Sequence, residues 1–191
     1  EIRLTRVFNA PRHLVFEAMT RPEHVRRWWG CLGDGYSVPV CEIDLRRGGK
    51  WRFVNRHPKG EAAFHGEYQE IAPPDRLVFT EIFEDFPDSP SLVTAEFTEE
   101  HGQTRMTVTA RYQSLEVRDM VIASGMARGA AISYDRLEEV VAELKRAVGQ
   151  LAEAMPEELV DPAGVDEAVV LDQAIDLAIV RLEEDFDPRV G

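Results

Sequence analysis

Alternation of apolar and polar positions dominates the middle of the chain. Six segments between residues 38 and 112 have the apolar content and alternation typical of strands: 38–45, 50–56, 62–71, 76–83, 92–99 and 104–112. The connectors between them, RRGG, HPKG, APPD, FPDSP and EEHGQ, are rich in turn-forming residues. Strands joined by such short turns predict a meander of antiparallel hairpins.

Helical spacing flanks this strand region. Residues 2–10 predict one further strand, and the prolines near the starts of 11–20 and 21–29 suit the first position of a helix. Residues 114–121 predict a turn or short helix. From 126 to 148 apolar residues recur every three or four positions, which predicts a long helix with one apolar face.

This order of elements predicts an α+β fold. A seven-stranded antiparallel sheet with one apolar face must bury that face against another layer. The long helix is the largest predicted element available for this purpose, and Gly149 is its expected end. The sequence therefore predicts a sheet that wraps around this helix.

The stretch DLRRGGKWRF combines basic residues with a glycine pair and raises the question of a phosphate loop. Gly48 and Gly49 separate two predicted strands, whereas a phosphate loop joins a strand to a helix. Glycine also tolerates the positive φ of a tight hairpin. We therefore interpret the pair as a hairpin turn, and its basic neighbours as solvated charges at a strand edge: Arg46, Arg47, Lys50 and Arg52.

The acidic charge of the chain is concentrated at its C-terminal end. The formal net charge is −13, and residues 150–191 hold 12 acidic residues against two arginines. An acidic protein is a poor partner for nucleic acid or an anionic membrane, so we expect neither. The asymmetry predicts a domain at 1–148 and an acidic extension at 149–191, with an amphipathic helix at 165–186. That helix must bury its apolar surface on the same chain, in a homodimer or on another protein.

The sequence contains few signals of targeting or metal chemistry. Cys31 and Cys41 form no Cys-X-X-Cys motif, and the five histidines show no metal-binding spacing, so we expect no metal and no cofactor. We find no signal peptide and no apolar run long enough to span a membrane. The expected location is the cytoplasm.

Four segments carry a resemblance to a known family: RPEHVRRWWG, EIDLRRGGKWRF, GEYQEIAPPDRLVFTEIF and GMARGAAISYDRLEEVVAEL. Together, over residues 2–144, they resemble the proteins similar to the activator of Hsp90 ATPase, in the START-like or polyketide cyclase-like (SRPBCC) superfamily. The resemblance implies the helix-grip fold, in which a curved antiparallel sheet wraps a long C-terminal helix around an apolar cavity. Members of the superfamily bind lipids, hormones or aromatic metabolites, and some catalyse cyclisation.

The composition of the long helix predicts where such a cavity lies. Its C-terminal half carries bulky residues and its N-terminal half small ones, so the space under its first turns is incompletely filled. The expected roof is Met126, Gly129, Ala130 and Ser133; the floor is Trp51, Phe53, Phe64, Tyr68, Phe79 and Phe97; the mouth is Trp28, Trp29 and the loop CLGDGY. The alternative is that these aromatic residues are ordinary core. Because adjacent helical residues cannot both face the core, one of the two tryptophans of the mouth should lie nearer the surface.

Glu81 is the most interesting carboxylate in a predicted strand. It shares parity with Phe79 and Phe83, so it could face inward, where burial would raise its pKa and suit it to acid–base chemistry. The alternative is that Val78 and Ile82 face inward and leave Glu81 in solvent. We favour the solvated alternative.

The other residues that could take part in catalysis do not indicate a particular reaction. His65 follows Phe64 in a strand and should face outward if Phe64 faces inward. No Gly-X-Ser-X-Gly element or other nucleophile–base pattern is present in the sequence. We expect binding of a small apolar or aromatic ligand, with two alternatives: a cyclase- or hydrolase-type enzyme using the same cavity, or an interaction module with a chaperone partner.

Overall fold

The computed structural model describes residues 1–154. The chain divides into two compact units, Glu1–Val141 and Ala142–Gly191, and the sheet lies entirely within the first. The helix predicted at 165–186 lies outside the described residues.

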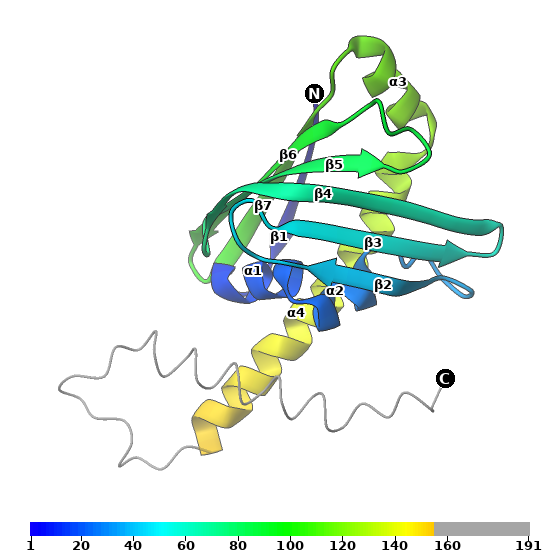
Figure 1. The fold of residues 1–191 in the computed structure, drawn as a ribbon. Helices are drawn as coiled ribbons and strands as arrows, with labels where there is room; N and C mark the ends of the chain where they lie inside the picture. Colours follow the sequence, from blue (N-terminus) through cyan, green and yellow to red (C-terminus); the bar gives the residue numbers. More distant parts are fainter. Residues whose placement is uncertain (155–191) are drawn as a thin grey trace. The chain divides into compact units, whose positions relative to one another are not determined.

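Seven strands form one antiparallel sheet (Figure 1). Its spatial order is β1-β7-β6-β5-β4-β3-β2, so β2 to β7 form an uninterrupted meander and β1 pairs with β7. The strands are β1 (Ile2–Phe8), β2 (Ser37–Ile43), β3 (Lys50–His57), β4 (Gly60–Ala72), β5 (Arg76–Phe83), β6 (Ser91–Glu100) and β7 (Gln103–Arg111). This confirms the predicted seven-stranded sheet and its chain order.

Four helices complete the described part of the chain: α1 (Arg12–Thr20), α2 (Pro22–Trp28), α3 (Leu115–Ala123) and α4 (Met126–Ala154). The part of α4 that belongs to the first unit runs across one face of the sheet (Figure 1), where Leu137, Val140 and Val141 are buried. We call this face the inner face. The architecture confirms the predicted helix-grip type of fold, but the expected end of the long helix at Gly149 is wrong. A single glycine weakens a helix by only about 1 kcal/mol relative to alanine, which is too little to end it.

The glycine pair after β2 forms the predicted turn. Gly48 has a φ of 77°, and Asp44 and Lys50 share a backbone hydrogen bond of 2.9 Å across the turn. Gly48 and Gly49 also exchange backbone hydrogen bonds with Tyr68 of β4. The turn therefore joins two antiparallel strands, and the glycines hold it against the next strand of the sheet.

One buried hydrogen bond ties the end of β1 to the start of β7. Thr104 is fully buried, and its hydroxyl donates to the carbonyl oxygen of Ala10 at 2.7 Å. Replacing Thr104 with valine should destabilise the protein by about 1–2 kcal/mol, because the Ala10 carbonyl loses its partner. The measurement is the free energy of unfolding in urea. Thr107→Val, at a partly exposed position of the same strand, is the control and should change it by only a few tenths of a kcal/mol.

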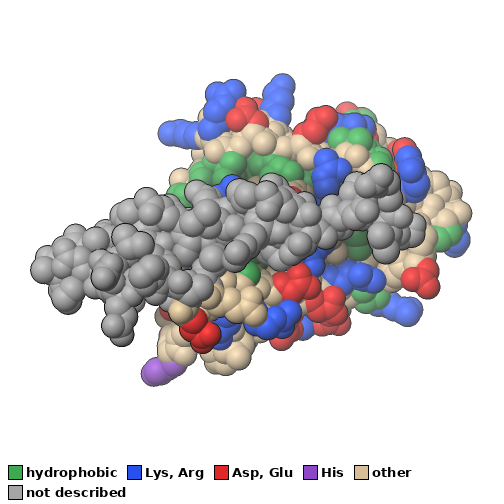
Figure 2. Space-filling view, turned by 90° about the horizontal axis from the view of Figure 1, so that it is seen from below, with side chains coloured by type: hydrophobic (Ala, Val, Ile, Leu, Met, Phe, Trp, Pro, Cys, Tyr) green, Lys and Arg blue, Asp and Glu red, His purple; other side chains and the backbone are tan. Residues whose placement is uncertain are grey.

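The described residues include no helix that is both long and apolar enough to cross a membrane. Acidic and basic side chains are interspersed over the described part of the face shown in Figure 2, beside patches of apolar side chains. This mixture fits the small net charge of the chain before residue 150.

Candidate functional site

Aromatic side chains from three neighbouring strands meet on the inner face of the sheet. Trp51 lies 4.8 Å from Phe53 and 5.7 Å from Phe79, and Phe79 lies 6.0 Å from Tyr68, measured between ring centroids. These residues come from alternating positions of β3, β4 and β5, which place their side chains on one face. We call them, with Phe64 and Trp29, the aromatic cluster.

Trp29 joins the cluster from outside the sheet. Its ring lies 5.1 Å from that of Phe53 and 5.2 Å from that of Phe64, both edge-on. It directly follows α2, which is attached to β2 because Arg26 donates to the carbonyl oxygens of Val38 and Pro39. Trp29 is partly exposed, which suits the predicted place at a rim.

Two other predicted site residues lie apart from the cluster. Trp28 is 5% exposed and its indole N–H donates to the carbonyl oxygen of Ala18, so it packs under the first helix. Phe97 is 3% exposed and packs edge-on against Phe16 of α1 at 5.8 Å. The expected difference between the adjacent tryptophans is therefore observed.

The first turns of α4 hold the predicted roof residues. Met126, Gly129 and Ala130 are partly exposed. A Cβ atom built on Gly129 would meet only the side chain of Leu32, at the ordinary van der Waals distance of 3.8 Å, so this turn of the helix is not tightly packed. Leu32 belongs to the CLGDGY loop, the predicted mouth.

Ser133, the fourth roof residue, is buried and fixes the loop instead of facing open space. Its hydroxyl accepts a hydrogen bond of 3.2 Å from the Gly30 N–H, and the Asn55 side-chain amide donates to the Gly30 carbonyl at 2.8 Å. Gly30 has a φ of 62°, and a Cβ atom there would lie 2.6 Å from the Asn55 amide nitrogen. The loop that follows Trp29 is thereby fixed to both α4 and β3.

Glu81 faces the aromatic cluster, so the favoured prediction of a solvated Glu81 is wrong. Pairing places Phe79 opposite Tyr68 and Phe83 opposite Phe64, which turns the whole Phe79–Glu81–Phe83 set toward the inner face. Burial among protein atoms raises the pKa of the Glu81 carboxyl from its ordinary value of 4.5 to about 7. A carboxyl with this pKa exchanges protons near neutral pH and can serve as an acid, a base or an anchor for a cation.

Two tyrosines that sequence reasoning missed lie near Glu81. Burial, and then the negative charge of Glu81, raise the pKa of Tyr112 to about 12 and also raise that of Tyr134. Tyr112 follows β7, and Tyr134 lies on α4 with its ring 6.5 Å from that of Trp28. Their hydroxyl groups add polar atoms to an otherwise apolar surface.

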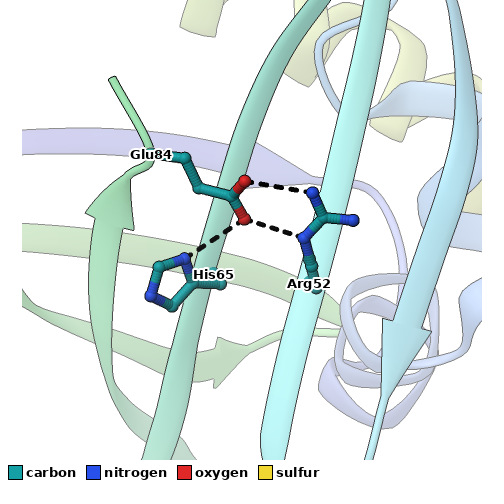
Figure 3. A network of polar contacts seen from close by, with 3 residues as sticks. All are labelled: Arg52, His65 and Glu84. Carbon is teal, nitrogen blue, oxygen red and sulfur yellow. Dashed lines mark hydrogen bonds and ion pairs between the residues drawn. The ribbon is translucent and has the colours of Figure 1, made fainter. Parts of the chain in front are cut away.

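The outer face of the sheet carries a separate, polar hollow of about 310 Å³. Arg52 binds Glu84 through two hydrogen bonds of 2.7 and 3.0 Å, and His65 lies 3.3 Å from the same carboxylate (Figure 3). Arg52 forms one wall of the hollow and is therefore ion-paired, whereas the sequence suggested a free solvated charge. His65 faces outward, as expected for a neighbour of Phe64.

Two arginines, Arg52 and Arg56, and three carboxylates line this hollow, and Arg56 pairs with Glu61 at 2.9 Å. Since both arginines already have carboxylate partners, the hollow is a weaker candidate for an anion site than its composition suggests. Residues 1–154 contain no group of three or more His, Cys, Asp or Glu side chains suited to a metal ion.

Comparison with known proteins identifies the family. The model of the family described as "Activator of Hsp90 ATPase homolog 1-like protein" matches residues 9–142, more than half of the chain. The chain belongs to this family. Members of the Hsp90 activator-like family commonly bind hydrophobic ligands, and the family also suggests a chaperone interaction.

Solved structures support the same assignment of fold. A protein from Rhodobacter sphaeroides is 27% identical with a TM-score of 0.67, over 73% of this chain and 91% of that one. A protein from Mycobacterium smegmatis is 27% identical with a TM-score of 0.65, over 72% and 88%. A protein from Nitrosomonas europaea, 24% identical with a TM-score of 0.67, covers 76% and 96% and supports the fold alone. A comparison with curated proteins found no match.

Proposed function

We propose that this protein binds a small apolar or aromatic molecule between the inner face of the sheet and the first turns of α4. The observation that carries the proposal is the aromatic cluster, in which Phe64 and Phe79 are partly exposed although they lie on the inner face, as is Trp29 beside them. Ordinary core aromatics are packed on all sides. Small residues on the facing helix, Gly129 and Ala130, leave room for such a molecule.

A variant that fills the space beside α4 tests the proposal. Gly129→Leu should reduce the affinity for the neutral dye N-phenyl-1-naphthylamine by at least about tenfold, because the leucine occupies the space proposed for the ligand. The measurement is the rise in dye fluorescence on titration with the protein. Leucine favours a helix more than glycine does, so loss of the helix would not explain the effect.

A specific observation also favours the alternative of an interaction module. Helix α3 exposes three large apolar side chains, Leu115, Met120 and Ile122, at 62%, 59% and 54%. Met120→Ser serves as the second variant in the dye titration. If the dye binds the inner face, Met120→Ser leaves its affinity unchanged. If Met120→Ser abolishes binding and Gly129→Leu does not, the dye binds α3 and the proposed site is wrong.

Several expectations from the sequence stay predictions. They are the division into a START-like domain at 1–148 and an acidic extension at 149–191, a homodimer, a chaperone partner and a cytoplasmic location. Native mass spectrometry of the freshly purified protein addresses two questions at once, since it reports both the oligomeric state and any retained small molecule.

A further inference from the structure

Glu81 is a carboxyl group without a counter-ion. Within residues 1–154 its side chain makes no ion pair and no hydrogen bond, while its backbone carbonyl accepts from the Ser91 hydroxyl at 3.4 Å. The titratable groups close to it are the phenols of Tyr112 and Tyr134, which carry no positive charge. Glu81 is half-buried, and a carboxylate that has lost part of its hydration is stabilised by a cation or a hydrogen-bond donor.

The Trp51 indole is a second polar group without a partner in this region; its N–H is a donor, so the partner it lacks is an acceptor and not the ammonium group. Trp51 is 3% exposed, and its N–H has no hydrogen-bond partner among the described residues. The nitrogen lies 2.6 Å from where a Cβ of Gly66 would stand. The register that pairs His65 with Ile82 and Tyr68 with Phe79 brings Gly66 beside Glu81. Two polar groups without partners therefore lie next to each other in the aromatic cluster.

Aromatic residues neighbour Glu81 on the inner face. Phe79 and Phe83 flank Glu81 on β5 and face the same way, with Trp51 edge-on to Phe79. Tyr112, which follows β7, and Tyr134 on α4 also lie close to Glu81. The faces of such rings attract cations, and a carboxylate among them is a site suited to an ammonium group. A purely apolar ligand would leave the carboxyl without a partner.

We propose that the site takes an apolar or aromatic molecule carrying a protonated amine, with the ammonium group bound between the Glu81 carboxylate and the surrounding rings. The inference rests on the proposed function and adds the chemical class of the ligand. Charge pairing requires the ionised carboxylate. Because the pKa of Glu81 is about 7, about 1% of these side chains are ionised at pH 5, so the site loses its attraction for the amine on acidification.

Three naphthalene probes that differ in their polar group test this inference. They are the amine 2-(1-naphthyl)ethylamine, the neutral alcohol 2-(1-naphthyl)ethanol and the carboxylate naphthalene-1-acetate. Binding to the full 191-residue chain is measured by isothermal titration calorimetry at pH 8 and pH 5. At pH 8 the amine should bind at least about tenfold more tightly than the alcohol, as expected for a hydrogen-bonded charge pair. At pH 5, where the amine is still protonated, the preference should disappear.

A substitution identifies the group responsible. Glu81→Gln should remove the amine preference at pH 8 while the affinity for the alcohol stays within about twofold. Glu42→Gln changes an exposed glutamate of β2 in the same sheet and should retain the full preference. The pH dependence of the wild-type protein needs no variant, so the inference remains testable even if Glu81→Gln folds poorly.

The outcomes separate the inference from the proposed function. If the alcohol binds and the amine binds no better, or the acetate binds best, the amine inference is overturned and the proposed function stands. If none of the three probes binds and N-phenyl-1-naphthylamine is not taken up, both fail. If the amine preference persists in Glu81→Gln, another group holds the ammonium and the assignment to Glu81 is overturned.

Discussion

Replacing Gly66 with alanine should destabilise the protein by roughly 3 kcal/mol, the upper end of the range for overpacking. An added Cβ atom would lie 1.7 Å from the Thr80 carbonyl oxygen of the neighbouring strand and 2.6 Å from the Trp51 indole nitrogen. Neither neighbour can yield easily, because Thr80 O belongs to the backbone of β5 and Trp51 is buried in the aromatic cluster. Urea unfolding followed by circular dichroism measures the effect.

A glycine with open surroundings provides the control. Gly129→Ala on α4 adds the same methyl group where the nearest neighbour is 3.8 Å away, and it should be neutral or stabilise the helix by a few tenths of a kcal/mol. Gly66→Ala should also weaken dye binding, since displacement of Trp51 disturbs the cluster. Wild-type stability in Gly66→Ala would mean that β4 and β5 do not approach each other this closely.

The sheet could be predicted well from the sequence because the patterns that indicate each hairpin lie within short stretches of the chain. Alternation and turn residues determine each hairpin of the meander, and consecutive hairpins then give the strand order without any long-range information. The assembly of Trp51, Phe53, Phe64 and Phe79 follows from the same alternation, because each has an inward parity within its own strand.

The orientation of β5 could not be decided from its own residues. The segment RLVFTEIF has apolar side chains on both faces, with Phe79 and Phe83 on one and Val78 and Ile82 on the other. The choice depends on pairing with Tyr68 of β4, which is distant information. A strand that is apolar on both faces gives no parity signal, and this is why Glu81 was expected in solvent.

Tyr112 and Tyr134 illustrate a second limit. They lie close to Glu81 although one follows β7 and the other belongs to α4, at sequence separations that no local pattern connects. Tyr134 lies within 126–148, where the apolar spacing predicted only a helix with one apolar face. The pairing of Arg52 with Glu84 is similar, since Glu84 follows the end of β5 and its position depends on the turn that comes next. Contacts between residues so far apart in the sequence depend on how the helices and strands pack, and the composition of each element does not predict them.

Glu81→Gln should be more stable than the wild type at pH 8. This advantage over the wild type should be about 2.5 kcal/mol larger at pH 8 than at pH 5. In the wild type, the pKa of Glu81 rises on folding from 4.5 to about 7 because the half-buried carboxyl is desolvated by the surrounding protein atoms. Between these values the unfolded chain has released the proton and the native protein still holds it. Raising the pH therefore favours unfolding across this window, and the loss is complete above pH 7.

Glutamine is neutral at every pH and has nearly the shape of the protonated glutamic acid. The variant should thus match the wild type near pH 5 and lack its loss of stability between pH 5 and 8; one pKa unit corresponds to about 1.4 kcal/mol. Urea unfolding at both pH values gives the two free energies of unfolding for each protein. Glu42→Gln, at an exposed position, removes the same kind of group and should follow the wild-type pH dependence.

The sign of this result bears directly on the role of Glu81. A residue that destabilises its own fold at neutral pH, and whose neutral replacement is more stable, is typical of a group kept for function rather than for structure. A bound amine should restore the lost stability of the wild type at pH 8 and have a much smaller effect on Glu81→Gln. If the difference between variant and wild type is the same at pH 5 and pH 8, Glu81 is solvated in the native protein and cannot be the buried anchor proposed for the ligand.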